Sequence, residues 1–236
     1  MLLDLIYVIL FAVALPLWGY FVDWPAFRRL AQVDPVRARK QLWTGTSLYP
    51  WVLVAIGAAL WMANDRSWAA LGFTVPHGWR WWASIALLLL ITAYYAYGIA
   101  TVARSADARA GIRQQAALTV VLPHTRAELL RWSGVALTAG FCEEFLYRGY
   151  FIWVFAPWLG WWGAAALSVA AFAALHFYQG WKGVLHTGIV GAVFALVVGI
   201  FDSLWPAIAL HALVDLSGGV MAWLALREGP ATRDRS

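Results

Sequence analysis

Charged residues are scarce in this sequence of 236 residues. They make up 12% of the chain, whereas 63% of the residues are hydrophobic. Soluble globular domains contain about 25% charged residues. Together with a mean hydropathy of +0.68, this composition excludes an ordinary water-soluble domain and indicates a membrane protein.

Cysteine and lysine are also rare. The single cysteine, Cys142, excludes an internal disulfide and a four-cysteine metal site. The basic residues lie between apolar runs and form no basic face interleaved with aromatic residues, so no nucleic acid is expected as a partner. The net charge of +5 instead favours membrane lipid headgroups as partners.

Long apolar runs are abundant. Each run has roughly 17 to 24 residues, close to the ~20 that a helix needs to cross the hydrocarbon layer. A transmembrane barrel would instead show ~10-residue segments of alternating hydrophobicity. We therefore predict an all-α bundle of about seven transmembrane helices. The predicted spans are residues 2–22, 47–63, 81–103, 134–156, 163–179, 184–201 and 205–226.

The predicted spans form one structural domain with three parts. Residues 1–133 hold three spans and basic loops, residues 134–226 form a four-helix core, and residues 227–236 are a tail. With the N-terminus outside, 14 basic residues fall in cytoplasmic segments and two, Arg66 and Arg80, fall outside. This bias predicts an outside N-terminus and a cytoplasmic C-terminus.

The two longest basic segments, residues 23–46 and 104–132, are expected to be cytoplasmic loops. Residues 105–122 are either an amphipathic helix on the membrane surface or a solvated loop. Arginine outnumbers lysine 15 to 2 and Ala, Gly and Trp are abundant, a composition that favours a GC-rich bacterium as the source. The expected location is therefore the bacterial inner membrane.

Aromatic residues cluster at the ends of the apolar runs. Such residues form belts at the membrane–water interface, because their amphipathic rings suit the headgroup level. The residues assigned to these belts are Trp18, Tyr20, Trp43, Trp81, Trp82, Trp158, Trp161, Trp162, Trp181 and Trp205.

The fourth span carries ionisable residues within its apolar run: Glu143, Glu144 and Arg148. A charge at the centre of a transmembrane helix costs roughly 2.5–3.5 kcal/mol, so such residues are retained for function or in pairs. Glu144 and Arg148 are four residues apart and are predicted to form an ion pair. Glu143 has no cation on its own face. Desolvation disfavours the charged form, so the Glu143 carboxylate takes up a proton more readily, which suits a general base.

Two later spans carry histidines at matching spacings. Phe172 precedes His176 by four residues, and His211 precedes Asp215 by four. This spacing lets His211 and Asp215 meet one metal ion or one water, as in helical zinc motifs. Alternatively, Asp215 orients His211 through a hydrogen bond. His176 taken alone is compatible with a hydrogen-bonded packing residue.

The three motifs occur in this order inside apolar runs, over residues 134–216. Together they resemble the signature of the CAAX-protease and bacteriocin-processing family, which includes the type II CAAX prenyl endopeptidases. The resemblance implies an α-helical intramembrane endopeptidase whose catalytic core is the last four spans. Its implied substrate is a membrane-associated or lipid-anchored peptide.

The resemblance also implies roles by position. Glu143 would activate a water molecule, and His176 would hold that water or a metal ion. His211 and Asp215 would complete the ligand set or stabilise the oxyanion. A zinc ion bound by these four residues and a metal-free glutamate mechanism are both compatible with the resemblance. The supporting residues are Glu144, Arg148 and Phe172.

The sequence departs from the family at Asp215, where the family pattern usually has Asn. An amide donates a hydrogen bond to an oxyanion, whereas an ionised carboxylate repels it. Asp215 is therefore a metal ligand, a partner that orients His211, or a protonated donor. If each span is a straight helix that crosses the membrane, the helical rise places His176 and His211 ~10–15 Å apart along the membrane normal.

Two other kinds of function use buried ionisable residues. A proton-coupled transporter is one, since ion pathways contain the same residue types, but the sequence shows no inverted repeat. A non-enzymatic membrane scaffold or immunity factor with the protease fold is the other. Proteolysis with a Glu143 variant as the control separates these alternatives.

Overall fold

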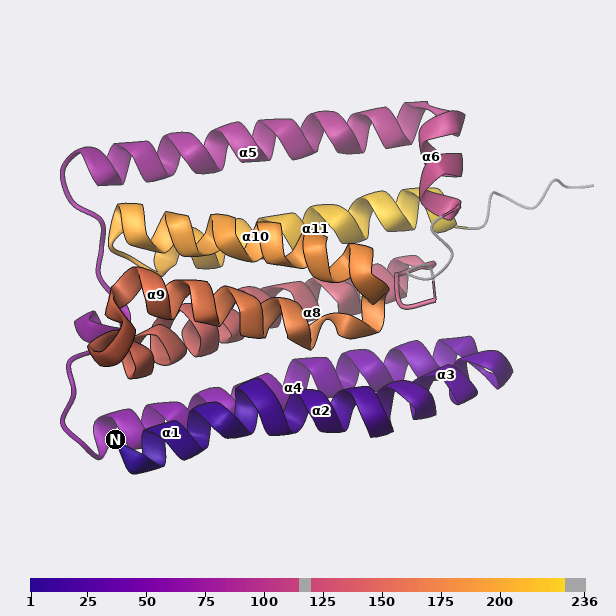
Figure 1. Cartoon of the computed structure of the whole chain (residues 1–236). Coiled ribbons are helices and arrows are strands. Elements are labelled where there is room, and N and C mark those ends of the chain that lie inside the picture. The colour runs from indigo at the N-terminus through magenta and orange to yellow at the C-terminus, as the bar shows by residue number, and fades with distance from the viewer. Residues whose placement is uncertain (115–119, 228–236) are drawn as a thin grey trace, which may run out of the picture.

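The computed structural model describes residues 1–114 and 120–227, and within these ranges the regular secondary structure is entirely helical (Figure 1). Six helical segments are long and apolar enough to cross a membrane. The predicted all-α, multi-pass membrane fold is therefore confirmed.

The first two segments are longer than the sequence predicted. Helical backbone runs from Leu2 to Val33, and a single non-helical residue, Asp34, separates it from the next helix, because its φ of −141° and ψ of 84° break the helix. The predicted loop at residues 23–46 is therefore wrong. Both helices project beyond their apolar runs as polar helical turns. The run comprises α1 (Leu2–Ile9), η1 (Leu10–Ala14), α2 (Leu15–Trp18), η2 (Gly19–Asp23) and α3 (Trp24–Val33), followed by α4 (Pro35–Met62).

The third segment leads into a short surface helix. A loop containing η3 (Trp68–Leu71) connects α4 to α5 (Trp79–Arg104), and α6 (Ala106–Arg113) follows. Ser105 caps α6, since its side chain accepts a hydrogen bond from the Ala108 amide. The helical reading of residues 105–122 thus holds for α6, while residues 115–119 of that range lie outside the described residues.

The fourth segment contains two membrane passes. It comprises α8 (Arg126–Glu143), the π-helical turn η4 (Glu144–Phe151) and α9 (Ile152–Leu175). Gly160 has a φ of 65° and a ψ of 167°, so the helix is interrupted there, and the chain turns back on itself (Figure 1). Only glycine adopts this conformation readily. The break lies between the predicted spans 134–156 and 163–179.

The last part of the chain is a helical hairpin. The short turn η5 (Phe177–Gln179) links α9 to α10 (Gly180–Phe201), and α11 (Trp205–Leu226) completes the bundle. The helix α11 packs against both α8 and α5. Its bounds coincide with the predicted seventh span. Residues 228–236, most of the predicted tail, lie outside the described residues, as do Arg233 and Arg235.

The interhelical packing is dominated by aromatic rings. One core cluster joins the first helix to η4 through residues such as Tyr7, Phe11 and Tyr150. Trp43 also packs inside the protein, where its indole Nε1 donates to the Val121 carbonyl over 3.1 Å. Its assignment to an interfacial belt is therefore wrong, since only 3% of this residue is exposed.

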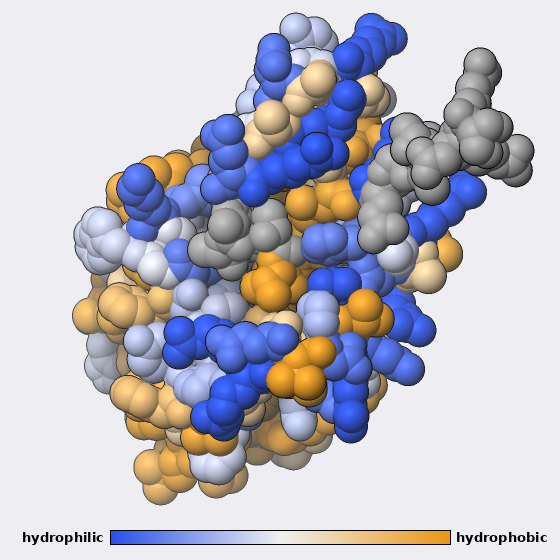
Figure 2. Space-filling view, turned by 90° about the vertical axis from the view of Figure 1, so that its right-hand side faces the viewer, coloured by the Kyte–Doolittle hydropathy of each residue, from blue (hydrophilic) through white to orange (hydrophobic). Residues whose placement is uncertain are grey.

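One end of the bundle is polar. The turn between α3 and α4, the helix α6 and the C-terminal end of α11 all lie at the right-hand end of Figure 1. Viewed from that end, hydrophilic side chains gather across the surface, with hydrophobic ones between and around them (Figure 2). The basic segments identified in the sequence thus meet on one face.

Candidate functional site

The candidate site lies where α8 and η4 meet α11. Glu143 ends α8, Glu144 begins η4, and His211 and Asp215 lie on α11. The helices approach closely because residue 140 is glycine: a Cβ there would lie 2.9 Å from both the backbone nitrogen and the Cβ of Ala212. This contact brings the first and third motifs together.

A π-helical turn positions the two glutamates and the arginine. All eight residues of η4, Glu144–Phe151, are buried. Short π-helical turns inside α-helices occur frequently at functional sites. Here the turn begins at the second glutamate and contains Arg148, so the ionisable part of the motif lies in non-standard helical geometry.

Glu144 forms the buried side of the site. Its Oε1 accepts a hydrogen bond from Arg148 Nη1 over 2.9 Å and another from His211 Nδ1 over 2.8 Å. The Glu144 and Arg148 side chains are both 0% exposed. An ionised carboxylate can only accept hydrogen bonds, so Nδ1 of His211 carries the proton. The predicted ion pair is present, and it also fixes the histidine.

Arg148 is held by more than its carboxylate. Its Nη2 donates to the Gly191 carbonyl over 3.0 Å, and its guanidinium lies 4.3 Å from the centre of the Phe172 ring. A Cβ at residue 191 would lie 2.9 Å from Nη2, so glycine leaves the room that the arginine needs. Arg148 therefore links η4 to α9 and α10 as well as to Glu144.

The accessible side of the site is formed by the other nitrogen of His211. Nε2 lies 3.7 Å from Glu143 Oε2 and 3.7 Å from Asp215 Oδ2. The Glu143 and Asp215 side chains are 19% and 34% exposed, against 6% for His211. Distances of this size are too long for direct hydrogen bonds, and a water molecule between such groups satisfies them. Two carboxylates thus face the same nitrogen of His211 on the accessible side of the site.

His176 lies next to this cluster. Its Nδ1 donates to the Phe172 carbonyl over 2.9 Å, and its ring centre is 4.9 Å from that of Phe172. The Phe172 ring in turn lies edge-on to His211, with centres 6.2 Å apart. In the described ranges, His176 forms no hydrogen bond or ion pair with Glu143, His211 or Asp215. Phe172 therefore contacts both histidines, and His176 lies beside the hydrogen-bonded cluster rather than within it.

The zinc ligands predicted from the sequence are Glu143, His176, His211 and Asp215. Within residues 1–114 and 120–227, no group of three or more His, Cys, Asp or Glu side chains is arranged to hold a metal ion. A catalytic zinc site needs three protein ligands and an open position. The described residues as placed do not meet that requirement.

Sequence reasoning missed the bond between Glu144 and His211. Spacing along one helix identifies Arg148 as a partner of Glu144, but a contact between residues 67 positions apart has no local signal. The sequence instead offered Asp215 as the residue that orients His211. At 3.7 Å from Nε2, Asp215 faces the opposite side of the ring from the hydrogen bond that fixes it.

The comparison with protein families supports the resemblance. Residues 125–217 match the family model described as Type II CAAX prenyl endopeptidase Rce1-like. All three motifs lie inside that range. No curated protein matches the chain, and neither does any solved structure. The resemblance read from the motifs is therefore confirmed over this segment.

Proposed function

We propose that this chain, in which residues 125–217 match the Type II CAAX prenyl endopeptidase Rce1-like family, is an intramembrane endopeptidase. Its substrate is a membrane-associated or lipid-anchored peptide. One observation carries the proposal: His211 has one nitrogen fixed by the buried Glu144, at 2.8 Å, and the other facing Glu143 and Asp215, at 3.7 Å each.

In the proposed reaction, Glu143 acts as the general base. Its carboxylate takes a proton from a water held between Glu143 and His211, and the resulting hydroxide attacks the carbonyl carbon of the peptide bond. The tetrahedral intermediate then collapses, the C–N bond breaks, and the protonated Glu143 returns its proton to the leaving amine. Glu143 is regenerated as a carboxylate.

His211 stabilises the charge that develops. In its protonated form, Nε2–H donates to the oxyanion while Nδ1–H stays bound to Glu144. Asp215 works beside it in protonated form, as a donor to the same oxygen, which avoids the repulsion that a second anion would cause. We assign His176 to the substrate side of the site. Its Nε2, the ring nitrogen that is not bonded to the Phe172 carbonyl, binds the peptide.

The orientation of the chain in the membrane is also part of the proposal. The chain is a multi-pass membrane protein, and hydrophilic side chains gather at the end of the bundle that holds the turn between α3 and α4 and the helix α6 (Figures 1 and 2). We propose that this end faces the cytoplasm, with the N-terminus outside and the C-terminus inside, and that the membrane is a bacterial inner membrane.

Peptide hydrolysis by the purified chain in liposomes tests the proposal. The substrate is a farnesylated peptide ending in a CAAX sequence, and its unprenylated form tests the need for a lipid anchor. We expect cleavage by the wild type and a loss of about 10²–10⁴-fold in Glu143→Gln, which lacks the base.

The matched control is Asp202→Asn, another carboxylate-to-amide change, at a side chain that is 82% exposed. The Asp202 backbone is left-handed, with a φ of 54°, which asparagine tolerates. Equal activity of Glu143→Gln and wild type would overturn the mechanism. Absence of cleavage together with Glu143-dependent proton flux would instead identify a transporter.

A further inference from the structure

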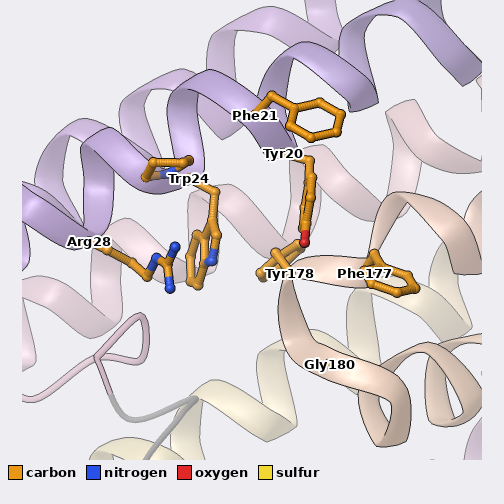
Figure 3. A pocket seen from close by; sticks show the side chains of 8 residues that line it. Tyr20, Phe21, Trp24, Arg28, Phe177, Tyr178 and Gly180 are labelled. Atoms are coloured by element: carbon orange, nitrogen blue, oxygen red, sulfur yellow. The ribbon is translucent and has the colours of Figure 1, made fainter.

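A hollow of about 370 Å³ lies outside the candidate site, between the first helical run and the turn η5 (Figure 3). Its wall comes from two parts of the chain that are distant in sequence. The first helix supplies aromatic side chains and one cation, and the turn after α9 supplies two further aromatic residues. The side chains concerned are Tyr20, Phe21, Trp24, Arg28, Phe177 and Tyr178.

Ring contacts across the hollow join its two walls. The Trp24 and Tyr178 rings lie 4.9 Å apart, and the Tyr20 and Phe177 rings lie 5.9 Å apart. Tyrosine and tryptophan prefer the headgroup level of a bilayer, because one part of the ring is apolar and another is polar. The hollow therefore has the lining expected at the boundary between acyl chains and headgroups.

A second hollow, of about 250 Å³, adjoins the first. It shares Pro25 and Arg28 with the first and adds Arg29 and Gln32. Arg28 and Arg29 are exposed, and neither forms an ion pair with a residue that the structure describes. The aromatic hollow thus opens directly onto two uncompensated positive charges.

We infer that these adjoining hollows bind one acidic phospholipid. An acyl chain lies in the aromatic hollow, and the phosphate binds Arg28 and Arg29. Charge complementarity selects this occupant, since anionic headgroups are attracted to basic side chains near the membrane surface while a zwitterionic lipid gains little. The inference about binding does not depend on the proposed function.

The bound lipid also contacts the turn that follows His176. Phe177 and Tyr178 are the next two residues, and the Tyr178 ring lies 6.0 Å from that of His176. On the premise of the proposed protease function, the lipid would hold this turn and so support the position of His176. Acidic lipid would then raise activity without touching Glu143.

Native mass spectrometry of the full chain in detergent tests the binding. The protein is titrated with phosphatidylglycerol and, separately, with phosphatidylcholine. We expect preferential binding of phosphatidylglycerol, and a loss of about 10–30-fold in that affinity for Arg28→Gln/Arg29→Gln, given the contribution of each basic residue. The matched control, Arg37→Gln/Lys40→Gln, removes the same charge from exposed positions outside both hollows and should keep wild-type affinity within about twofold.

A labelling experiment reports on the aromatic hollow itself. Cys142 is 0% exposed, so a cysteine introduced at Phe21, which is 68% exposed, is the reactive thiol. Phosphatidylglycerol should slow maleimide labelling of Phe21→Cys, while glycerophosphoglycerol, which has no acyl chains, should not. Labelling of Leu48→Cys, at a residue 61% exposed, should be unchanged.

Three outcomes would overturn the inference. They are equal binding of the two lipids by the wild type, an equal loss in both charge variants, and no protection of Phe21→Cys. None of them bears on hydrolysis, so a failure here is distinct from a failure of the proposed function.

Discussion

Two buried carboxylates in this protein, Asp4 and Glu144, can be compared directly. Each is paired with an arginine, each is almost inaccessible, at 2% and 0% exposure, and each contacts a residue of the π-helical turn η4. By burial and pairing alone they are equivalent. Their other partners distinguish them.

Asp4 has the hydrogen bonds of a purely structural group. Its Oδ1 accepts from Arg66 Nη1 and from the Tyr150 hydroxyl, each over 2.6 Å, and its Oδ2 accepts from Arg66 Nη2 over 3.0 Å. Both oxygens are occupied, and every partner ends in this cluster. Asp4 therefore attaches the first helix to η4 and offers nothing to a reactant.

Glu144 is less completely satisfied. Its Oε1 accepts both hydrogen bonds, while Oε2 is buried without a partner among the described residues. One of its partners is a histidine whose second nitrogen faces accessible side chains. A buried charge thus points to function when its hydrogen bonds lead outward to a titratable group, rather than when it is merely buried and paired.

Replacement of each carboxylate by its amide should give the largest difference between Asp4 and Glu144. Glu144→Gln removes the anion that fixes the Nδ1–H tautomer of His211, so we expect hydrolysis to fall by about 10²–10⁴-fold, as when the carboxylate of a catalytic triad is replaced. Asp4→Asn should lower the thermal unfolding midpoint in detergent but leave the activity of the folded fraction within about threefold.

Both amide variants are measured for hydrolysis and for thermal unfolding in the same detergent. A Glu144→Gln protein with unchanged hydrolysis would show that Glu144 is as purely structural as Asp4. A large loss of activity per folded molecule in Asp4→Asn would contradict the distinction from the other side.

Replacement of His211 and of His176 should affect different kinetic constants. His211→Ala removes the group that faces both Glu143 and Asp215, and we expect a loss of about 10²–10³-fold in kcat, as for an oxyanion donor. His176 makes its hydrogen bond to a backbone carbonyl, and its proposed role lies in holding the peptide. His176→Ala should therefore raise KM more than it lowers kcat. Steady-state kinetics separates the two effects, and a larger fall in kcat for His176→Ala would reverse the assignment.

The sequence predicted much of the fold, because membrane spans have a local signal. The seventh predicted span, 205–226, coincides with α11, and the break at Gly160 falls between two predicted spans. The helical continuation of residues 23–46 was missed, since polar residues there suggested a loop while only Asp34 departs from the helix. Hydropathy detects where a helix crosses lipid, but not how far it continues into water.

The site was predictable within one helix but less so between helices. The spacing of Glu144 and Arg148 gave their ion pair correctly, because residues four apart share a helical face. The bond from His211 to Glu144 depends on the rotation of two helices and on the close approach at Gly140. The contact of Phe172 with both histidines depends on the same rotation. No periodic pattern encodes these angles.

Replacement of Arg148 or Arg66 by alanine compares how much each ion pair contributes to the free energy of unfolding. Arg148→Ala leaves Glu144 as a buried charge, and we expect a loss of about 3–5 kcal/mol. Arg66→Ala should cost less, because the Arg66 side chain is 15% exposed whereas that of Arg148 is 0% exposed. The double variant Glu144→Leu/Arg148→Met should recover part of the loss, since no buried charge remains. Unfolding in detergent gives these values, and additive damage in the double variant would mean that the pair is not coupled.

The smallest expected effect is the most informative about the chemistry. Asp215→Asn hardly changes the side-chain volume, but it replaces a carboxylate by an amide 3.7 Å from His211 Nε2. If a metal ion takes part, the loss of an anionic ligand should lower metal content and activity together. If Asp215 acts as a protonated donor, asparagine supplies the same hydrogen bond, and hydrolysis should stay within about fivefold of wild type.

We expect the second result, because the described residues contain no group of three or more ligands arranged for a metal ion. Metal analysis of the purified wild type and hydrolysis with and without a chelator complete the test. Stoichiometric zinc that is lost in Asp215→Asn, with activity lost in parallel, would show that the ligands close around a metal in the working enzyme. Full activity of Asp215→Asn in the presence of chelator would leave Glu143 as the group that activates water, and would make the residue at 215 a hydrogen-bond donor whether it is Asp or Asn.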